Sequence, residues 1–144
     1  MKSVRWQNMD IYPTKIVCVG RNYAAHITEL DNPVPDQAVF FIKPNSAISA
    51  EVNSDPSETV HYEGEICFLV NSGQLCAVGF GLELTKRGLQ SYLKSRGLPW
   101  ERSKSFDKSA VFTEFVSFNS DTEALRMMKE IIDKIVQQGD YDLM

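Results

Sequence analysis

The residues best suited to chemistry are the two acids of the segment His61-Tyr62-Glu63-Gly64-Glu65. An apolar run, residues 66–70, follows directly and is typical of a strand. Side chains two positions apart on a strand point to the same side, so we expect both carboxylates on one face. Such a pair repels itself unless a cation joins it, and oxygen ligands suit Mg²⁺, Ca²⁺ or Mn²⁺. A solvated strand edge is the other interpretation.

A third carboxylate, Glu83, lies inside the apolar stretch 79–84. A charge in such surroundings needs a partner. One interpretation is a salt bridge to Lys86 or Arg87, and the other is a third metal ligand. Three carboxylates suit an octahedral ion that keeps positions open for a substrate.

The order of charges along the chain favours an anionic ligand. Residues 51–65 hold five acids and no Lys or Arg, whereas residues 86–108 hold seven bases and two acids. If the two segments meet in the fold, a metal and several cations would flank one cleft. A small anionic substrate that also chelates the metal would fit there. Two separate solvated faces are the alternative.

His26 and Glu29 form a further candidate pair, because residues three apart can touch on a helical turn. A histidine oriented by a carboxylate can act as a general base, although such pairs are often structural. The segment Arg21-Asn22-Tyr23 precedes the pair and follows a predicted strand, a common place for functional loops.

The elements that must position these residues are mainly strands. Hydrophobic patterning predicts strands at 15–20, 38–42, 66–70, 75–84 and 111–118, with the second of these buried. Helical turns are predicted at 22–30, a turn at Asn71-Ser72-Gly73, and a helix at 84–95 with Gly97 as its C-terminal cap. Residues 124–138 have helical spacing, but Asp133-Lys134 between apolar pairs also fits a hairpin.

Length and composition fit one globular domain of 144 residues with short helices in a mostly β, α+β fold. A net charge of −4 disfavours nucleic acid as a partner. No apolar run is long enough to span a membrane, and no signal peptide is visible, so we expect a cytoplasmic protein. The odd number of cysteines is typical of reduced thiols in that compartment. They are Cys18, Cys67 and Cys76.

Four motifs in this order resemble the fumarylacetoacetate hydrolase superfamily, in particular its small bacterial members and the related acylpyruvases and oxaloacetate-processing enzymes. The similarity runs over residues 15–116 and more faintly to 144. The motifs are Gly20-Arg21-Asn22-Tyr23-Ala24-Ala25-His26, Phe41-Ile42-Lys43-Pro44, Tyr62-Glu63-Gly64-Glu65-Ile66, and Gly97-Leu98-Pro99-Trp100 with Lys104-Ser105-Phe106-Asp107.

The resemblance implies a fold of mixed β-sheets, a homodimer, and a Mg²⁺ or Mn²⁺ ion held by Glu63, Glu65 and Glu83. The family usually has aspartate at the third position, so the glutamate here is one methylene longer. The implied catalytic residues are His26, Glu29 and Lys104, the first two activating water. The implied substrate-binding residues are Arg21, Tyr23, Lys43, Arg87 and Gln90.

The implied function is that of a metal-dependent hydrolase or isomerase acting on a small 2-oxo acid through a metal-bound enolate. An acylpyruvate, fumarylpyruvate or oxaloacetate would be hydrolysed, decarboxylated or tautomerised from that enolate. The chain has no Thr-Gly-x-Pro segment, which the family carries further on. We therefore expect a catalytic domain that is incomplete at its C-terminus, with a hairpin at 126–138. A non-catalytic member that keeps the metal-binding fold is the alternative.

Overall fold

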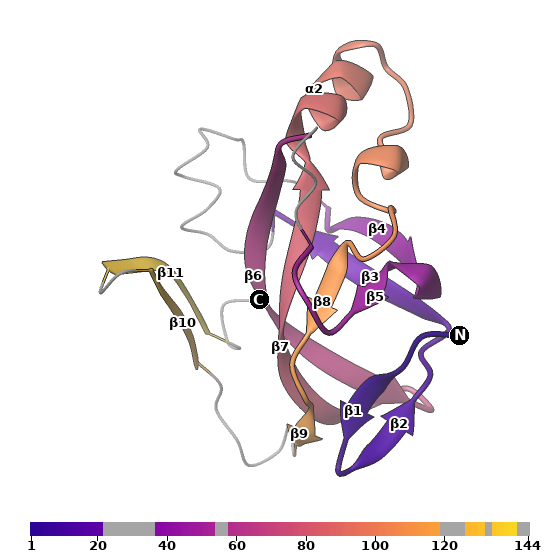
Figure 1. The fold of residues 1–144 in the computed structure, drawn as a ribbon, viewed down its shortest axis with the longest axis vertical. Coiled ribbons are helices and arrows are strands. Elements are labelled where there is room, and N and C mark those ends of the chain that lie inside the picture. Colours follow the sequence, from indigo (N-terminus) through magenta and orange to yellow (C-terminus); the bar gives the residue numbers. More distant parts are fainter. Residues whose placement is uncertain (22–36, 54–57, 119–125, 132–133, 141–144) are drawn as a thin grey trace.

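A computed structural model describes residues 1–21, 37–53 and 58–118, and the backbone of 126–131 and 134–140. Strands dominate it, which confirms the mostly β prediction (Figure 1). The strands are β1 (Val4–Trp6), β2 (Met9–Ile11), β3 (Lys15–Gly20), β4 (Val39–Pro44), β5 (Ile48–Ser49), β6 (Val60–Asn71), β7 (Gln74–Lys86), β8 (Ala110–Phe112), β9 (Val116–Ser117), β10 (Arg126–Ile131) and β11 (Lys134–Asp140). The helices are α2 (Arg87–Ser95) and the 3-10 turns η1 (Asn45–Ala47) and η2 (Glu101–Ser103).

Strands β6 and β7 form the long antiparallel hairpin that carries the candidate site. The predicted turn is confirmed: Ser72 and Gly73 both have positive φ, 51° and 80°, as the tight hairpin turn requires. The register shifts once, because Leu69 pairs with Ala77 whereas Val70 pairs with Leu75. Cys76 is therefore the extra residue of a β-bulge.

The main sheet has the strand order β5-β8-β7-β6, with β9 paired to a further part of β7. It is mixed, because β5 and β8 are parallel while the other pairs are antiparallel. A buried cluster of Val4, Ile48, Ala77 and Phe115 joins this sheet to the N-terminal hairpin β1–β2. Gly79 lets the ring of Phe115 approach the sheet, since a Cβ there would lie 3.0 Å from that ring.

Strands β3 and β4 form a separate two-stranded antiparallel sheet. The strand at 38–42 is found, but the prediction that it is buried is wrong. Its residues alternate, and Phe40 and Ile42 are 62% and 45% exposed. They pair with Val19 and Val17, which are also exposed. Among the described residues only one face of this sheet is covered, so alternate side chains remain in solvent.

The predicted helix at 84–95 begins later than expected, at Arg87. Leu84 still pairs with Tyr62 in the ladder, and its N–H donates to the Ser109 carbonyl at 2.9 Å. The predicted cap at Gly97 is confirmed by its φ of +64°. The Gly97 N–H donates to Lys94 O and the Leu98 N–H to Leu93 O, which is the pairing of a Schellman motif.

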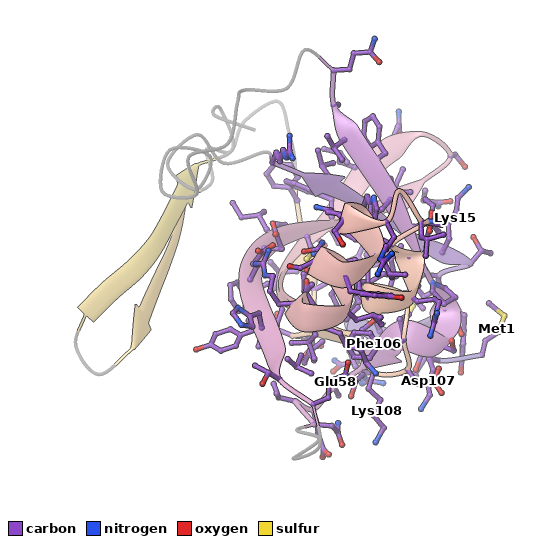
Figure 2. The ribbon with its side chains drawn as sticks, turned by 90° about the horizontal axis from the view of Figure 1, so that it is seen from above. Met1, Lys15, Glu58, Phe106, Asp107 and Lys108 are labelled. Carbon is purple, nitrogen blue, oxygen red and sulfur yellow. The ribbon has the colours of Figure 1, made fainter. Side chains whose placement is uncertain are left out.

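The strand expected at 111–118 is split into β8 and β9. Between them the N–H of Phe115 donates to the Arg5 carbonyl at 2.8 Å, so the chain leaves β7 to bond the first hairpin. The hairpin expected at 126–138 is confirmed as β10–β11, which projects from the rest of the fold (Figures 1 and 2). The described helices include none long and apolar enough to cross a membrane.

Candidate functional site

The β6–β7 ladder places the three predicted carboxylates on one face. Glu63 pairs directly with Glu83, and Glu65 pairs with Gly81. Partners in an antiparallel pair project to the same side, and so do residues two apart on one strand. Further along the same face lie Cys67 and Ala77, which belong to the hydrophobic core or pack against it. The acidic face therefore continues directly into the core.

Glu83 is buried and is paired with two lysines rather than with Lys86 or Arg87. Its Oε1 lies 2.8 Å from Lys43 Nζ, and its Oε2 lies 2.5 Å from Lys104 Nζ. The Thr85 hydroxyl, two residues along the same strand, also donates to Oε2 at 2.8 Å. A carboxylate removed from water in this way stays charged only because cations and donors surround it.

Lys43 ties three segments together and is completely buried. Its ammonium donates to the carbonyl of Leu84 at 3.2 Å, to the hydroxyl of Ser109 at 3.0 Å and to the carbonyl of Lys104. Burial lowers the pKa of Lys43, while the adjacent Glu83 charge opposes that effect. Lys43 therefore fixes both the buried carboxylate and the backbone of the residue that also binds it.

Glu63 is paired with the first turn of α2. The Arg87 guanidinium lies 3.1 Å from Glu63 Oε1 and donates to Gln90 Oε1 at 3.3 Å. The other pairs between the acidic and basic segments include Lys86 with Glu58 at 2.7 Å. The expected meeting of the acidic and basic segments is thus found.

Aromatic rings support the cations of the site. Lys104 Nζ lies 5.0 Å from the centre of the Phe41 ring, and that ring meets Trp100 edge to face at 5.5 Å. Lys86 Nζ lies 4.8 Å from the Phe106 ring centre and also binds Glu58, so it joins two residues that Figure 2 shows on the same side of the molecule. Contacts of this kind favour cations in partly dry surroundings.

The three cysteines form no disulfide among the described residues, and each is partly buried. Burial raises the pKa of Cys18 to about 12 and that of Cys67 to about 12. Both groups are therefore neutral thiols near pH 7 and add no charge to the site.

The donor set fits a hard divalent cation in kind. The three carboxylates share a face, and among the described residues the buried Glu83 Oε1 has an ion pair with Lys43 but no hydrogen bond. Gly81, which pairs with Glu65, lets Cys67 Sγ pack close to the strand, since a Cβ there would lie 2.7 Å from that sulfur. As the side chains stand, no three acidic, histidine or cysteine groups within the described part of the chain converge on one point. Lysine and arginine balance Glu83 and Glu63 instead.

The remaining candidates divide into two groups. Arg21 is described, directly after β3, and has a left-handed φ of 56°. Tyr23, His26 and Glu29 lie outside the described residues, as do the helical turns expected at 22–30. Sequence reasoning missed Thr85 and Ser109, which bind Glu83 and Lys43. The position of Thr85 two residues after Glu83 was a usable signal, whereas nothing local pointed to Ser109.

The fold and the sequence together identify a protein family. The profile of the fumarylacetoacetate (FAA) hydrolase C-terminal family matches residues 15–144. The chain belongs to the fumarylacetoacetate hydrolase family, as its motifs predicted.

Curated relatives of known activity are similar to this chain. The oxaloacetate tautomerase YcgM of Escherichia coli K12 is 32% identical over 93% of this chain and 70% of its own length. The mitochondrial oxaloacetate tautomerase oaa1 of Schizosaccharomyces pombe is 37% identical over 65% of this chain and 50% of its own. The chain therefore spans between half and about 70% of these curated relatives.

Solved structures show the same fold. A structure from Oleispira antarctica superposes with a TM-score of 0.84 at 36% identity, covering 97% of this chain and 72% of that one. Fumarylpyruvate hydrolase from Pseudomonas aeruginosa, in complex with Mn²⁺ and pyruvate, gives 0.81 at 26% identity, covering 99% and 71%.

Proposed function

We propose that this chain binds a divalent cation, Mg²⁺ or Mn²⁺, and acts on a small 2-oxo acid, with keto–enol tautomerisation of oxaloacetate as its reaction. The observation that carries the proposal is the placement of Glu63, Glu65 and Glu83 on one face, surrounded by lysine and arginine. Relatives named oxaloacetate tautomerases, about 30% identical, support the substrate class. Self-association as a homodimer belongs to the same proposal and is measured by sedimentation equilibrium.

Glu63, Glu65 and Glu83 would hold the cation. When bound, it supplies Lewis-acid stabilisation of negative charge on the 2-oxo oxygen. Arg87, held by Glu63 and Gln90, is placed to bind a substrate carboxylate.

Tautomerisation takes one proton from C3 of the substrate and adds one to the 2-oxo oxygen, so it needs a single positioned proton carrier. Lys104, whose ammonium lies 2.5 Å from Glu83 Oε2, is the proposed carrier among the described residues. Its ammonium would give a proton to the 2-oxo oxygen, and the neutral amine would then take the proton from C3. Hydrolysis of an acylpyruvate would also need an activated water, which the proposal assigns to His26 and Glu29.

The test combines thermal melting with an assay. We expect Mn²⁺ to raise the melting temperature relative to EDTA, and oxalate, a dianion that imitates the enolate, to raise it further. The variant Glu65→Gln should lose both shifts and the metal-dependent turnover of oxaloacetate. Glu114→Gln, an exposed acid after β8, is the matched control and should keep them.

An unchanged metal shift in Glu63→Gln, Glu65→Gln and Glu83→Gln would overturn the assignment of the ligands. Metal binding in the wild type without any turnover would instead favour a non-catalytic member of the family.

A further inference from the structure

Lys94 lies on the face of α2 that carries the proposed substrate-binding residues. Arg87, Gln90 and Lys94 are spaced three and four residues apart, which places them in one row along a helix. The first two already contact each other, and Arg87 reaches Glu63. Lys94 is therefore the next side chain of this row, one turn further from the metal-binding face.

The side chain and backbone of Lys94 are both held. Its ammonium lies 5.4 Å from the centre of the Trp100 ring. Trp100 packs against Phe41, and the ammonium of Lys104 lies over the Phe41 ring. The carbonyl of Lys94 accepts the Gly97 N–H at 3.1 Å in the helix cap. The aromatic pair thus places the two ammonium groups of Lys94 and Lys104 around one small region.

The charges around Lys94 are mostly of its own sign. Partial burial lowers the pKa of Lys94, and the positive charges of Arg21, Lys104 and Arg87 lower it further, while Glu63 opposes them. In the described part of the chain Lys94 forms no ion pair with a carboxylate. Cations held together without an anion repel one another, so a bound anion would be stabilised there.

We propose that Lys94 binds the second carboxylate of a 2-oxo dicarboxylate and so selects dicarboxylates over 2-oxo monocarboxylates. This inference rests on the proposed function, in which the first carboxylate and the 2-oxo oxygen face the metal ligands. A dicarboxylate such as oxaloacetate then presents its second carboxylate away from that end. Lys94 is a cation about two helical turns beyond Arg87, and one turn beyond Gln90, in that direction.

The test uses two ligands with the same four-carbon chain, oxaloacetate and 2-oxobutyrate, which differ only in a terminal carboxylate against a methyl group. Dissociation constants are measured by calorimetry on the Mn²⁺-loaded protein. The variants are Lys94→Met, which keeps a stem over Trp100, and Lys94→Arg, which keeps the charge. Arg96→Met is the matched control, because Arg96 lies at the same helix end but stacks on Tyr92 at 5.8 Å.

We expect Lys94→Met to weaken oxaloacetate binding about tenfold, as for a lost charge-assisted hydrogen bond, and to leave 2-oxobutyrate unchanged. Lys94→Arg should restore most of the affinity, and Arg96→Met should alter neither ligand. Equal weakening of both ligands, or no change in either, would overturn the role of Lys94 while leaving the proposed function standing. If the wild type binds neither ligand, the proposed function fails and this inference fails with it.

Discussion

Glu83 shows how a single residue can combine two tasks. A buried carboxylate is tolerated only with strong partners, and here it has two ammonium groups and a hydroxyl. Those partners hold the charge in place, and among the described residues Oε1 is in contact with the Lys43 ammonium alone of them. Glu83 therefore anchors β4 and the loop before β8, and it is also a candidate metal ligand.

The substitution Lys43→Met tests the anchoring role. It leaves Glu83 with one cation fewer and leaves the carbonyls of Leu84 and Lys104 without this donor. Removing one partner of a buried ion pair typically lowers the free energy of unfolding by about 3–5 kcal/mol. Urea unfolding of the metal-free protein measures this change in the free energy of unfolding.

The matched control for that prediction is Lys15→Met, an exposed lysine at the start of the adjacent strand, which should change stability by less than about 0.5 kcal/mol. Adding Glu83→Gln to Lys43→Met should deepen the loss, since it leaves the buried Lys104 ammonium without its carboxylate. An equal effect of the two lysine variants would contradict the anchoring role.

For single residues, the sequence correctly predicted the features that depend only on local backbone geometry. The spacing of Glu63 and Glu65 correctly predicted a shared face, because it depends only on strand geometry. It could not predict that Glu83 would be paired with Lys43, since that contact joins residues forty positions apart in the chain. The expected local partners, Lys86 and Arg87, bind other acids instead.

Among the elements, α2 matters most for the site, because it continues β7 directly and carries Arg87, Gln90 and Lys94. Its C-terminal cap depends on Gly97, whose left-handed backbone favours a residue without Cβ. The position of this helix end therefore decides where the last of the three side chains lies.

Two glycine substitutions in and after this helix should have opposite effects. Gly97→Ala is expected to lower the free energy of unfolding by about 1 kcal/mol through backbone strain alone, since a Cβ there would touch nothing within 4 Å. Gly88 also has nothing within 4 Å of an added Cβ but lies inside the helix, so Gly88→Ala should raise the free energy of unfolding by about 0.5 kcal/mol. Thermal unfolding measures both, and a loss of stability in both variants would contradict this account.

Most strands were predictable from their apolar runs, and the start of α2 was not. Leu84, Leu89 and Leu93 fit a helical face, yet Leu84 is held in the sheet by Tyr62 and Ser109. Local periodicity contains no information on such pairing. In the tail, residues 124–138 fitted both a helix and a hairpin, and the family resemblance correctly favoured the hairpin.

At the scale of the molecule, the described residues include an apolar surface that faces solvent. Val17, Val19, Phe40 and Ile42 are cross-strand neighbours on the outer face of β3–β4, and each is at least 41% exposed. Contiguous exposed apolar groups bind other apolar molecules, whereas single ones generally do not.

A hydrophobic dye reports on this surface. We expect the native chain to enhance the fluorescence of such a dye, and Phe40→Ser to remove more than half of that enhancement while the unfolding transition is kept. Val70→Ser is the control, because Val70 is 63% exposed but lies by the β6–β7 turn, away from this face. An equal loss in both variants would show that the dye does not report on the β3–β4 face.

The bulge at Cys76 sets the phase of the whole β6–β7 hairpin. On the turn side of the bulge Asn71 pairs with Gln74, and continuing that phase with Cys76 paired to Leu69 would set Glu63 opposite Leu82. The bulge leaves Cys76 out of the pairing, which shifts the register by one position and sets Glu83 opposite Glu63 instead. The chemistry of this face therefore depends on a distortion of the backbone far from it: a hairpin that paired Cys76 in the regular ladder would turn an acidic pair into an acid facing a leucine.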